Sequence, residues 1–224
     1  MNNASVMRYR KPKGLVGRLQ QLILQPILFF KSLPDQSESR SWFWAALLIL
    51  ILAGYSAVRR DAISAATSGT DGAVQARLIL AIGATASIIL SWLIQMLLLA
   101  LATMLQGKKP IWSINFRIAI WASIPLLLMS IAQIVYMAIG GELISMAFLA
   151  NESLASGTSD AITILLGNLL RQVSIFNLWR MVLFYLGASY SLNSPKWIAI
   201  LLTVLSFASL FLLPTLWQIS FLGS

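Results

Sequence analysis

The feature that most constrains this sequence is a stretch from Leu78 to Gly107 that contains no charged residue. An α-helix needs about 20 apolar residues to cross the hydrocarbon core of a bilayer, so this stretch exceeds one span. Across the chain 58% of residues are hydrophobic and 10% are charged, against about 25% charged residues in soluble domains. So few charges cannot cover a soluble surface, and we expect an integral membrane protein.

The apolar pattern predicts an all-α fold: a polytopic membrane helical bundle of five transmembrane helices with an N-terminal interfacial amphipathic helix. The five expected helices cover residues 42–58, 77–105, 114–140, 178–191 and 195–217. Residues 1–40 form the basic tail and interfacial helix, and residues 41–224 form the membrane domain. The apolar segment 161–172 is too short to span, so we expect an interfacial or re-entrant helix there; one long helix over 160–190 is the alternative.

The N-terminal part combines a basic tail with an amphipathic segment. Residues 15–33 carry apolar side chains at near-helical spacing and are interrupted by Pro26, which predicts an interfacial helix bent or broken at that point. The tail is either disordered or tethered to anionic headgroups, each basic residue near the surface contributing about 1 kcal/mol. The candidate contacts to anionic membrane lipids, in this tail and in the turn after the second span, are Arg8, Arg10, Lys11, Lys13, Lys108 and Lys109.

The placement of the 16 Lys and Arg residues predicts the orientation in the membrane. Most of them lie in the N-terminal part and in the loop after the second span, which share one side of a five-span protein. Cytoplasmic loops carry the excess of Lys and Arg. We therefore expect a cytoplasmic N-terminus and, after five crossings, an external C-terminus.

Arg180 is a charge inside the fourth apolar helix. A charged side chain at the centre of a membrane helix costs roughly 2.5–3.5 kcal/mol, so it normally faces protein or water. Asn177, about one turn earlier, is the expected N-cap of that helix. The sequence leaves two roles open: a site for an anion, a lipid headgroup or a partner helix, or a structural arginine bonded to carbonyls freed near Pro125 or to Gln133. These four residues form the candidate intramembrane polar site.

Small residues mark a candidate helix-packing face. The second span carries Gly83, Ser87 and Ser91, and the fourth carries Gly187. Small side chains let two membrane helices approach closely. The face then packs either within the bundle or against another subunit of an oligomer.

The residue inventory excludes several kinds of chemistry. The chain has no His and no Cys, which removes imidazole bases, thiolate chemistry and most transition-metal sites. Its acidic residues lie in the tail and loops, so the sequence provides no buried aspartate pair and no intramembrane carboxylate for proton coupling. We expect no enzyme activity, no metal, no cofactor and no nucleic-acid partner.

Three motifs in order resemble the Yip family of small membrane proteins, the Ypt-interacting proteins and their bacterial relatives. They are Gln25-Pro26-Ile27-Leu28-Phe29-Phe30, then Gly107 followed by Phe116 to Pro125, and then Ile175-Phe176-Asn177-Leu178-Trp179 with Gly187, Ser194 and Lys196. The resemblance covers about residues 20 to 215. It implies five spans, a cytoplasmic N-terminus and no catalysis, and the short N-terminal region favours a bacterial-type member of the cytoplasmic (inner) membrane.

The resemblance leaves three functions to compare. Some bacterial relatives look like accessory subunits of ABC-type export systems, which suggests a non-enzymatic scaffold that binds another membrane protein or forms a homo-oligomer. A small solute or lipid transporter, with Arg180 and the kink at Pro125 lining its path, is the first alternative. Eukaryotic members resemble vesicle-trafficking adaptors for Rab-type GTPases, which is the second alternative.

Overall fold

The computed structural model describes residues 14–35, 40–68, 74–139 and 161–222, and in these ranges the regular structure is helical throughout. In chain order the elements are α1 (Gly14–Leu24), α2 (Pro26–Ser32), α3 (Ser41–Ser68), α4 (Val74–Leu105), α5 (Trp112–Ala122), α6 (Ile124–Ala138), α7 (Ala161–Gln172), α8 (Ile175–Leu186), the short π-helix η2 (Gly187–Ser191) and α9 (Lys196–Leu222). The expected all-α bundle is confirmed.

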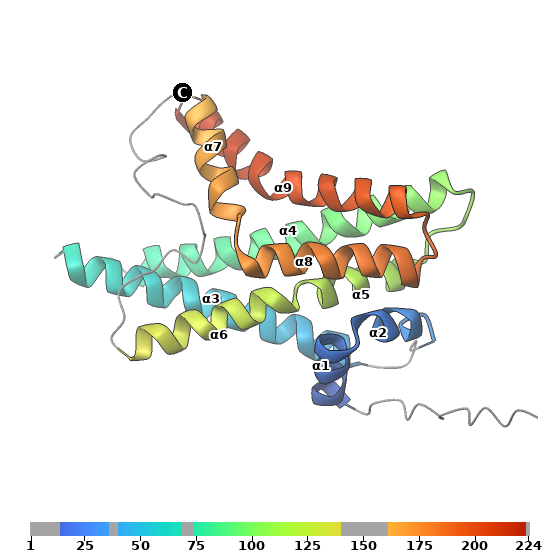
Figure 1. Cartoon of the computed structure of the whole chain (residues 1–224). Helices are drawn as coiled ribbons and strands as arrows, with labels where there is room; N and C mark the ends of the chain where they lie inside the picture. Colours follow the sequence, from blue (N-terminus) through green and yellow to red (C-terminus); the bar gives the residue numbers. More distant parts are fainter. Residues whose placement is uncertain (1–13, 36–39, 69–73, 140–160, 223–224) are drawn as a thin grey trace, which may run out of the picture.

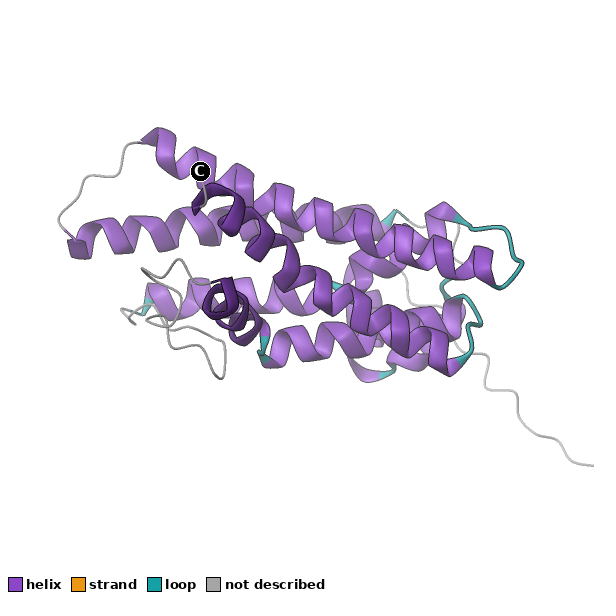
Figure 2. Ribbon diagram, turned by 90° about the horizontal axis from the view of Figure 1, so that it is seen from above, coloured by secondary structure: helices purple, strands orange, loops and turns teal. Residues whose placement is uncertain are grey.

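The long helices run alongside one another and form the bundle, as Figure 1 shows from the side and Figure 2 from above. The helices α1 and α2 cover one end of it. At the other end α7 turns away from the bundle direction and packs against the later part of α9 (Figure 1). The core is built mainly from aliphatic side chains and from Trp121, Phe29, Phe30 and Phe184, all of which are buried.

Length and composition identify two membrane-crossing helices in the described ranges, Ala81–Leu105 and Trp112–Tyr136. The bent pair Ile162–Leu170 and Ile175–Ser191 makes a third if it counts as one span, and Ser41–Tyr55 and Lys196–Leu210 are apolar parts of α3 and α9. The five expected apolar segments are therefore all helical, while their number of crossings stays a prediction. The first expected helix was too short: α3 continues beyond Arg59 and Asp61 to Ser68, because charged residues are compatible with a helix that leaves the hydrocarbon core.

The third span is interrupted at Ser123, two residues before Pro125. A proline has no backbone N–H to donate and crowds the preceding turn, which explains a break close to this position. Inside the break the Ser123 hydroxyl donates to the Ala119 carbonyl (2.9 Å) and accepts a hydrogen bond from the Trp92 indole N–H (2.9 Å). The break in the third span is thereby tied to α4.

The segment before the fourth span is a separate helix. The axes of α7 and α8 meet at 80°, so one continuous helix over 160–190 is excluded. The cap of α8 is Ser174, whose hydroxyl accepts from the Asn177 N–H (3.2 Å), and the expectation that Asn177 is the cap was wrong. Both residues have suitable side chains, and the extended backbone at Ser174 decides which of them caps the helix.

The N-terminal helices are docked on the bundle by one face. The buried face of α2 contains Phe29 and Phe30; Phe29 contacts the Trp121 ring edge-on, with 5.0 Å between centroids. The Ser191 hydroxyl donates to the Phe30 carbonyl (2.7 Å). The opposite face leaves apolar residues such as Val16 exposed, as expected for an amphipathic helix at an interface.

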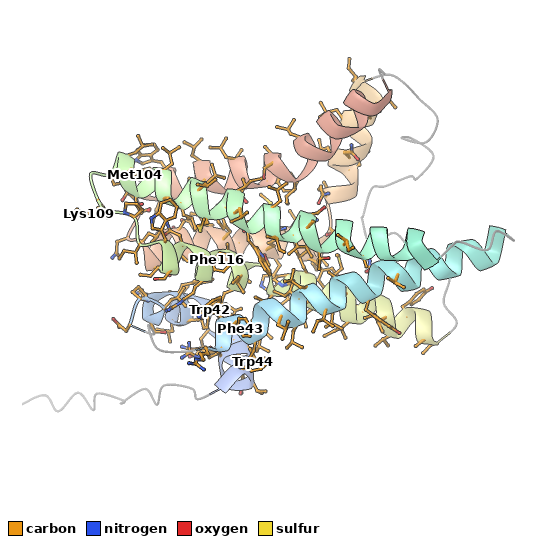
Figure 3. All side chains as sticks on the ribbon, turned by 180° about the vertical axis from the view of Figure 1, so that it is seen from behind. Trp42, Phe43, Trp44, Met104, Lys109 and Phe116 are labelled. Carbon is orange, nitrogen blue, oxygen red and sulfur yellow. The ribbon has the colours of Figure 1, made fainter. Side chains whose placement is uncertain are left out.

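Three segments distant in sequence meet at the end of the bundle that α1 and α2 cover. Besides the contact at Ser191, Gln106 donates to the Ser194 hydroxyl (3.0 Å), and Lys108 Nζ lies 3.4 Å from the carbonyl oxygens of Leu192 and Asn193. An aromatic group lies near the same end, where Trp42, Phe43 and Trp44 begin α3 and Trp42 contacts Phe116 (Figure 3). Aromatic side chains of this kind are enriched at membrane interfaces.

Candidate polar site inside the bundle

Arg180 lies on α8 and is 4% exposed. Its Nη2 donates to the hydroxyl of Ser91 on α4, at 2.6 Å. The expected structural partners, carbonyls near Pro125 or the side chain of Gln133, were therefore wrong. Arg180 reaches instead toward the small-residue face of the second span, because its long side chain extends from α8 as far as α4.

A second polar contact lies one helical turn along α4 from Ser91. Gln95 is 1% exposed and its Nε2 donates to the hydroxyl of Ser206 on α9, at 2.9 Å. On the same face of α9 the Thr203 hydroxyl donates to the Ala199 carbonyl (2.7 Å). Side chains from α4, α8 and α9 thus form one polar layer within the apolar bundle.

A small cavity lies in this layer. It measures about 10 Å³ and is lined by Gln95, Arg180, Met181, Phe184, Thr203, Ser206, Phe207 and Leu210. A cavity of about this volume holds one water molecule. Two buried atoms of its lining side chains have no hydrogen-bond partner, the donor Nε of Arg180 and the acceptor Oε1 of Gln95. A single water can satisfy a donor and an acceptor together.

The charge of Arg180 has no carboxylate beside it in the described part of the chain. The acidic residues there are Asp35, which follows α2, and Asp61, which lies in α3. Neither belongs to the three helices that line the cavity. A buried charge without a counter-charge is costly in a membrane, which makes this position a functional candidate.

The other candidate residues of the polar site lie elsewhere. Asn177 braces the bend between α7 and α8, because its Nδ2 donates to the carbonyl and to Oε1 of Gln172, both at 3.0 Å. Pro125 is buried and Gln133 half-buried on α6. None of these three lines the cavity. Gln95 and Ser206 complete the site; the sequence signal for Gln95 is its spacing of four residues from Ser91.

The candidate packing residues fall into two groups. Gly187 lies at a tight helix contact: a Cβ at this position would overlap a methyl group of Ile118 and come within 3.2 Å of the Phe30 ring. Gly83 and Ser87 are exposed, and a Cβ at Gly83 would meet nothing within 4 Å. Ser91 is half-buried and bonded to Arg180.

Two of the six candidate lipid contacts lie in the described residues. Arg8, Arg10, Lys11 and Lys13 lie outside the described residues, and Lys108 and Lys109 are exposed in the turn after α4. At the same end of the bundle, burial lowers the pKa of Arg18 on α1, and the positive charge of Arg117 lowers it further. Two neighbouring guanidinium groups add to the positive potential of this end.

Most of the chain matches one known protein family. A family model described as the Yip1 domain matches residues 21–217. The chain belongs to the Yip1 domain family. No curated protein and no solved structure matches the chain. The Yip1 match begins within α1 and ends within α9, so the polar layer around Arg180 lies inside the domain. Family and apolar helices together establish a membrane protein.

Proposed function

We propose that this Yip1 domain protein is a non-enzymatic membrane scaffold, an accessory subunit that binds another membrane protein in a complex such as an ABC-type exporter. It lies in a bacterial cytoplasmic membrane with five spans, a cytoplasmic N-terminus and an external C-terminus. The end at which α1, α2 and Lys108 meet is the cytoplasmic end, because positive charge collects there.

One observation carries the scaffold proposal: two polar contacts between helices of the bundle lie around a space for about one water. Arg180 is engaged by Ser91 and Gln95 by Ser206, and the cavity between them measures about 10 Å³. A solute or lipid larger than water does not fit there. Helices that pack this closely leave the outer surface of the bundle to bind a partner protein in the membrane.

Two other functions require different observations. A small solute or lipid transporter would move its cargo past Arg180 and the break in the third span near Pro125. An adaptor for Rab-type GTPases would bind its partner on the cytoplasmic segment before α3. In the described part of that segment, α2 already uses Phe29 and Phe30 to pack on the bundle.

Purification of the tagged protein in a gentle detergent, followed by mass spectrometry, tests the proposal. We expect a second membrane protein in stoichiometric amount. The full chain purified alone, with a tightly held solute or lipid, would contradict the scaffold and favour transport. A GTPase as the stoichiometric partner would favour the adaptor.

A further inference from the structure

One side of α4 carries a continuous row of small and polar residues. Gly83, Ser87, Ser91 and Gln95 follow one another at intervals of four, so they lie on the same face of the helix. The two ends of the row differ. Gln95 is covered by α9 through Ser206, whereas Gly83 and Ser87 are exposed. We call Gly83, Ser87 and Ser91 together the α4 stripe.

The α4 stripe leads from the open surface to a buried cation. Ser91, its last residue, is half-buried and accepts the hydrogen bond of Arg180. Arg180 is 4% exposed, its Nε has no hydrogen-bond partner, and it lines the small cavity. The guanidinium group therefore meets the stripe at Ser91 and retains an unused donor, and no carboxylate of the described ranges lies on the helices around it.

The depth of this point in the membrane limits what can balance the charge. Ser91 lies thirteen residues after Leu78 and fourteen before Leu105, the ends of the apolar part of α4, which corresponds to roughly 20 Å and roughly 21 Å along the helix. Half of a typical hydrocarbon core is about 15 Å thick. A lipid phosphate stays at the surface of the core, whereas a carboxylate on a transmembrane helix reaches this depth.

We propose that the α4 stripe is the docking surface for a transmembrane helix of another membrane protein, and that this helix carries one Asp or Glu at mid-membrane depth to pair with Arg180. This inference rests on the proposed scaffold function and names the chemistry of its partner. Gly83 and Ser87 let the two backbones approach closely, as small residues do at membrane helix contacts. The planar guanidinium then supplies two donors to the carboxylate.

A second copy of this chain does not have the required chemistry. All seven acidic residues lie outside the apolar spans, at positions 35, 38, 61, 71, 142, 152 and 160. A copy docked on the stripe would therefore bring no carboxylate to Arg180. When the partner's carboxylate takes over Arg180, the Ser91 hydroxyl can donate to the carbonyl one turn earlier, as membrane serines commonly do.

Binding of synthetic helices to the full-length protein in phosphatidylcholine vesicles tests the docking chemistry. The probes are two dansyl-labelled Leu/Ala peptides of about 22 residues that differ only in a central Glu or Gln. The protein's eight tryptophans serve as energy donors. We expect the Glu peptide to bind at least about tenfold more tightly than the Gln peptide.

Variants locate the binding surface. Arg180→Gln should abolish the preference for Glu, and Arg180→Lys should keep most of it. Ser87→Leu should weaken both peptides about tenfold, whereas the control Ser87→Ala should not. Ser87 is exposed, so the leucine leaves the fold intact. Equal binding of both peptides, no binding of either, or a Glu preference that survives Arg180→Gln would overturn the proposal.

Copurification of the native partner with these variants distinguishes a failure of this inference from a failure of the scaffold function. If the stripe is the docking surface, the partner copurifies with wild type and Ser87→Ala but is lost with Ser87→Leu. A partner retained by both Ser87→Leu and Arg180→Gln would overturn the stripe and leave the scaffold standing. An anionic lipid that is held only when Arg180 is present, without any peptide preference, would overturn it in favour of a phosphate ligand.

Discussion

Arg180 is a buried arginine with no carboxylate beside it among the residues that the structure describes. Its guanidinium donates to the Ser91 hydroxyl at 2.6 Å, and its Nε is buried without a hydrogen-bond partner. In the described part of the chain, no acidic residue lies on α4, α8 or α9. Burying a charge without a counter-charge leaves its desolvation cost uncompensated, and an apolar side chain of similar size avoids that cost.

We therefore expect Arg180→Met to leave the thermal stability of the purified protein unchanged or to raise it. Gln95→Ala is the matched control, because it removes a neutral side chain that is bonded to Ser206; we expect it to lower the free energy of unfolding by about 1 kcal/mol. Thermal unfolding in detergent measures both. A marked loss of stability in Arg180→Met alone would show that the arginine is structural.

Two glycines show how differently the helix surfaces are packed. Gly187 lies where η2 begins, against Ile118 of α5 and Phe30 of α2, and so joins three elements. Gly83 lies on α4 in open space. Glycine thus lets three elements pack closely at Gly187, whereas at Gly83 it faces no neighbour within 4 Å.

Gly187→Ala should destabilise the protein by about 1–3 kcal/mol, since the branched Ile118 side chain cannot move aside without repacking the core. Gly83→Ala should leave the stability unchanged or slightly higher, because alanine favours the helix and meets no neighbour. Thermal melts of the two variants compare these costs. Equal effects would mean that the contact at Gly187 does not limit the packing of α2 and α5.

Sequence patterns predict the helices well and the contacts poorly. Long apolar stretches and Pro125 indicate the spans and the break near Ser123, since these depend on local composition and backbone chemistry. The partner of Arg180 does not follow from them, because Ser91 lies 89 residues away in sequence. The cap of α8 depends on the turn between two helices at 80°, which apolar periodicity does not encode.

The two ends of the helical bundle are built differently. At one end, hydrogen bonds at Ser191, Gln106 and Lys108 join α2, the turn at Lys108 and the turn at Asn193, and α1 packs against α2. At the other end α7 and the later part of α9 diverge from the bundle (Figure 1). In a five-span scaffold with a cytoplasmic N-terminus, the first end faces the cytoplasm and the polar layer lies within the membrane.

Cysteine labelling in cells tests this arrangement most directly, because the natural chain has no cysteine to interfere. Lys109→Cys and Ser224→Cys are each exposed to a maleimide that does not cross membranes, and the buried Leu99→Cys is the control. We predict that Ser224→Cys reacts in intact cells, that Lys109→Cys reacts only after permeabilisation, and that Leu99→Cys does not react. Labelling of positions 109 and 224 from the same side would mean an even number of crossings between them and would contradict the five-span membrane scaffold, which has three.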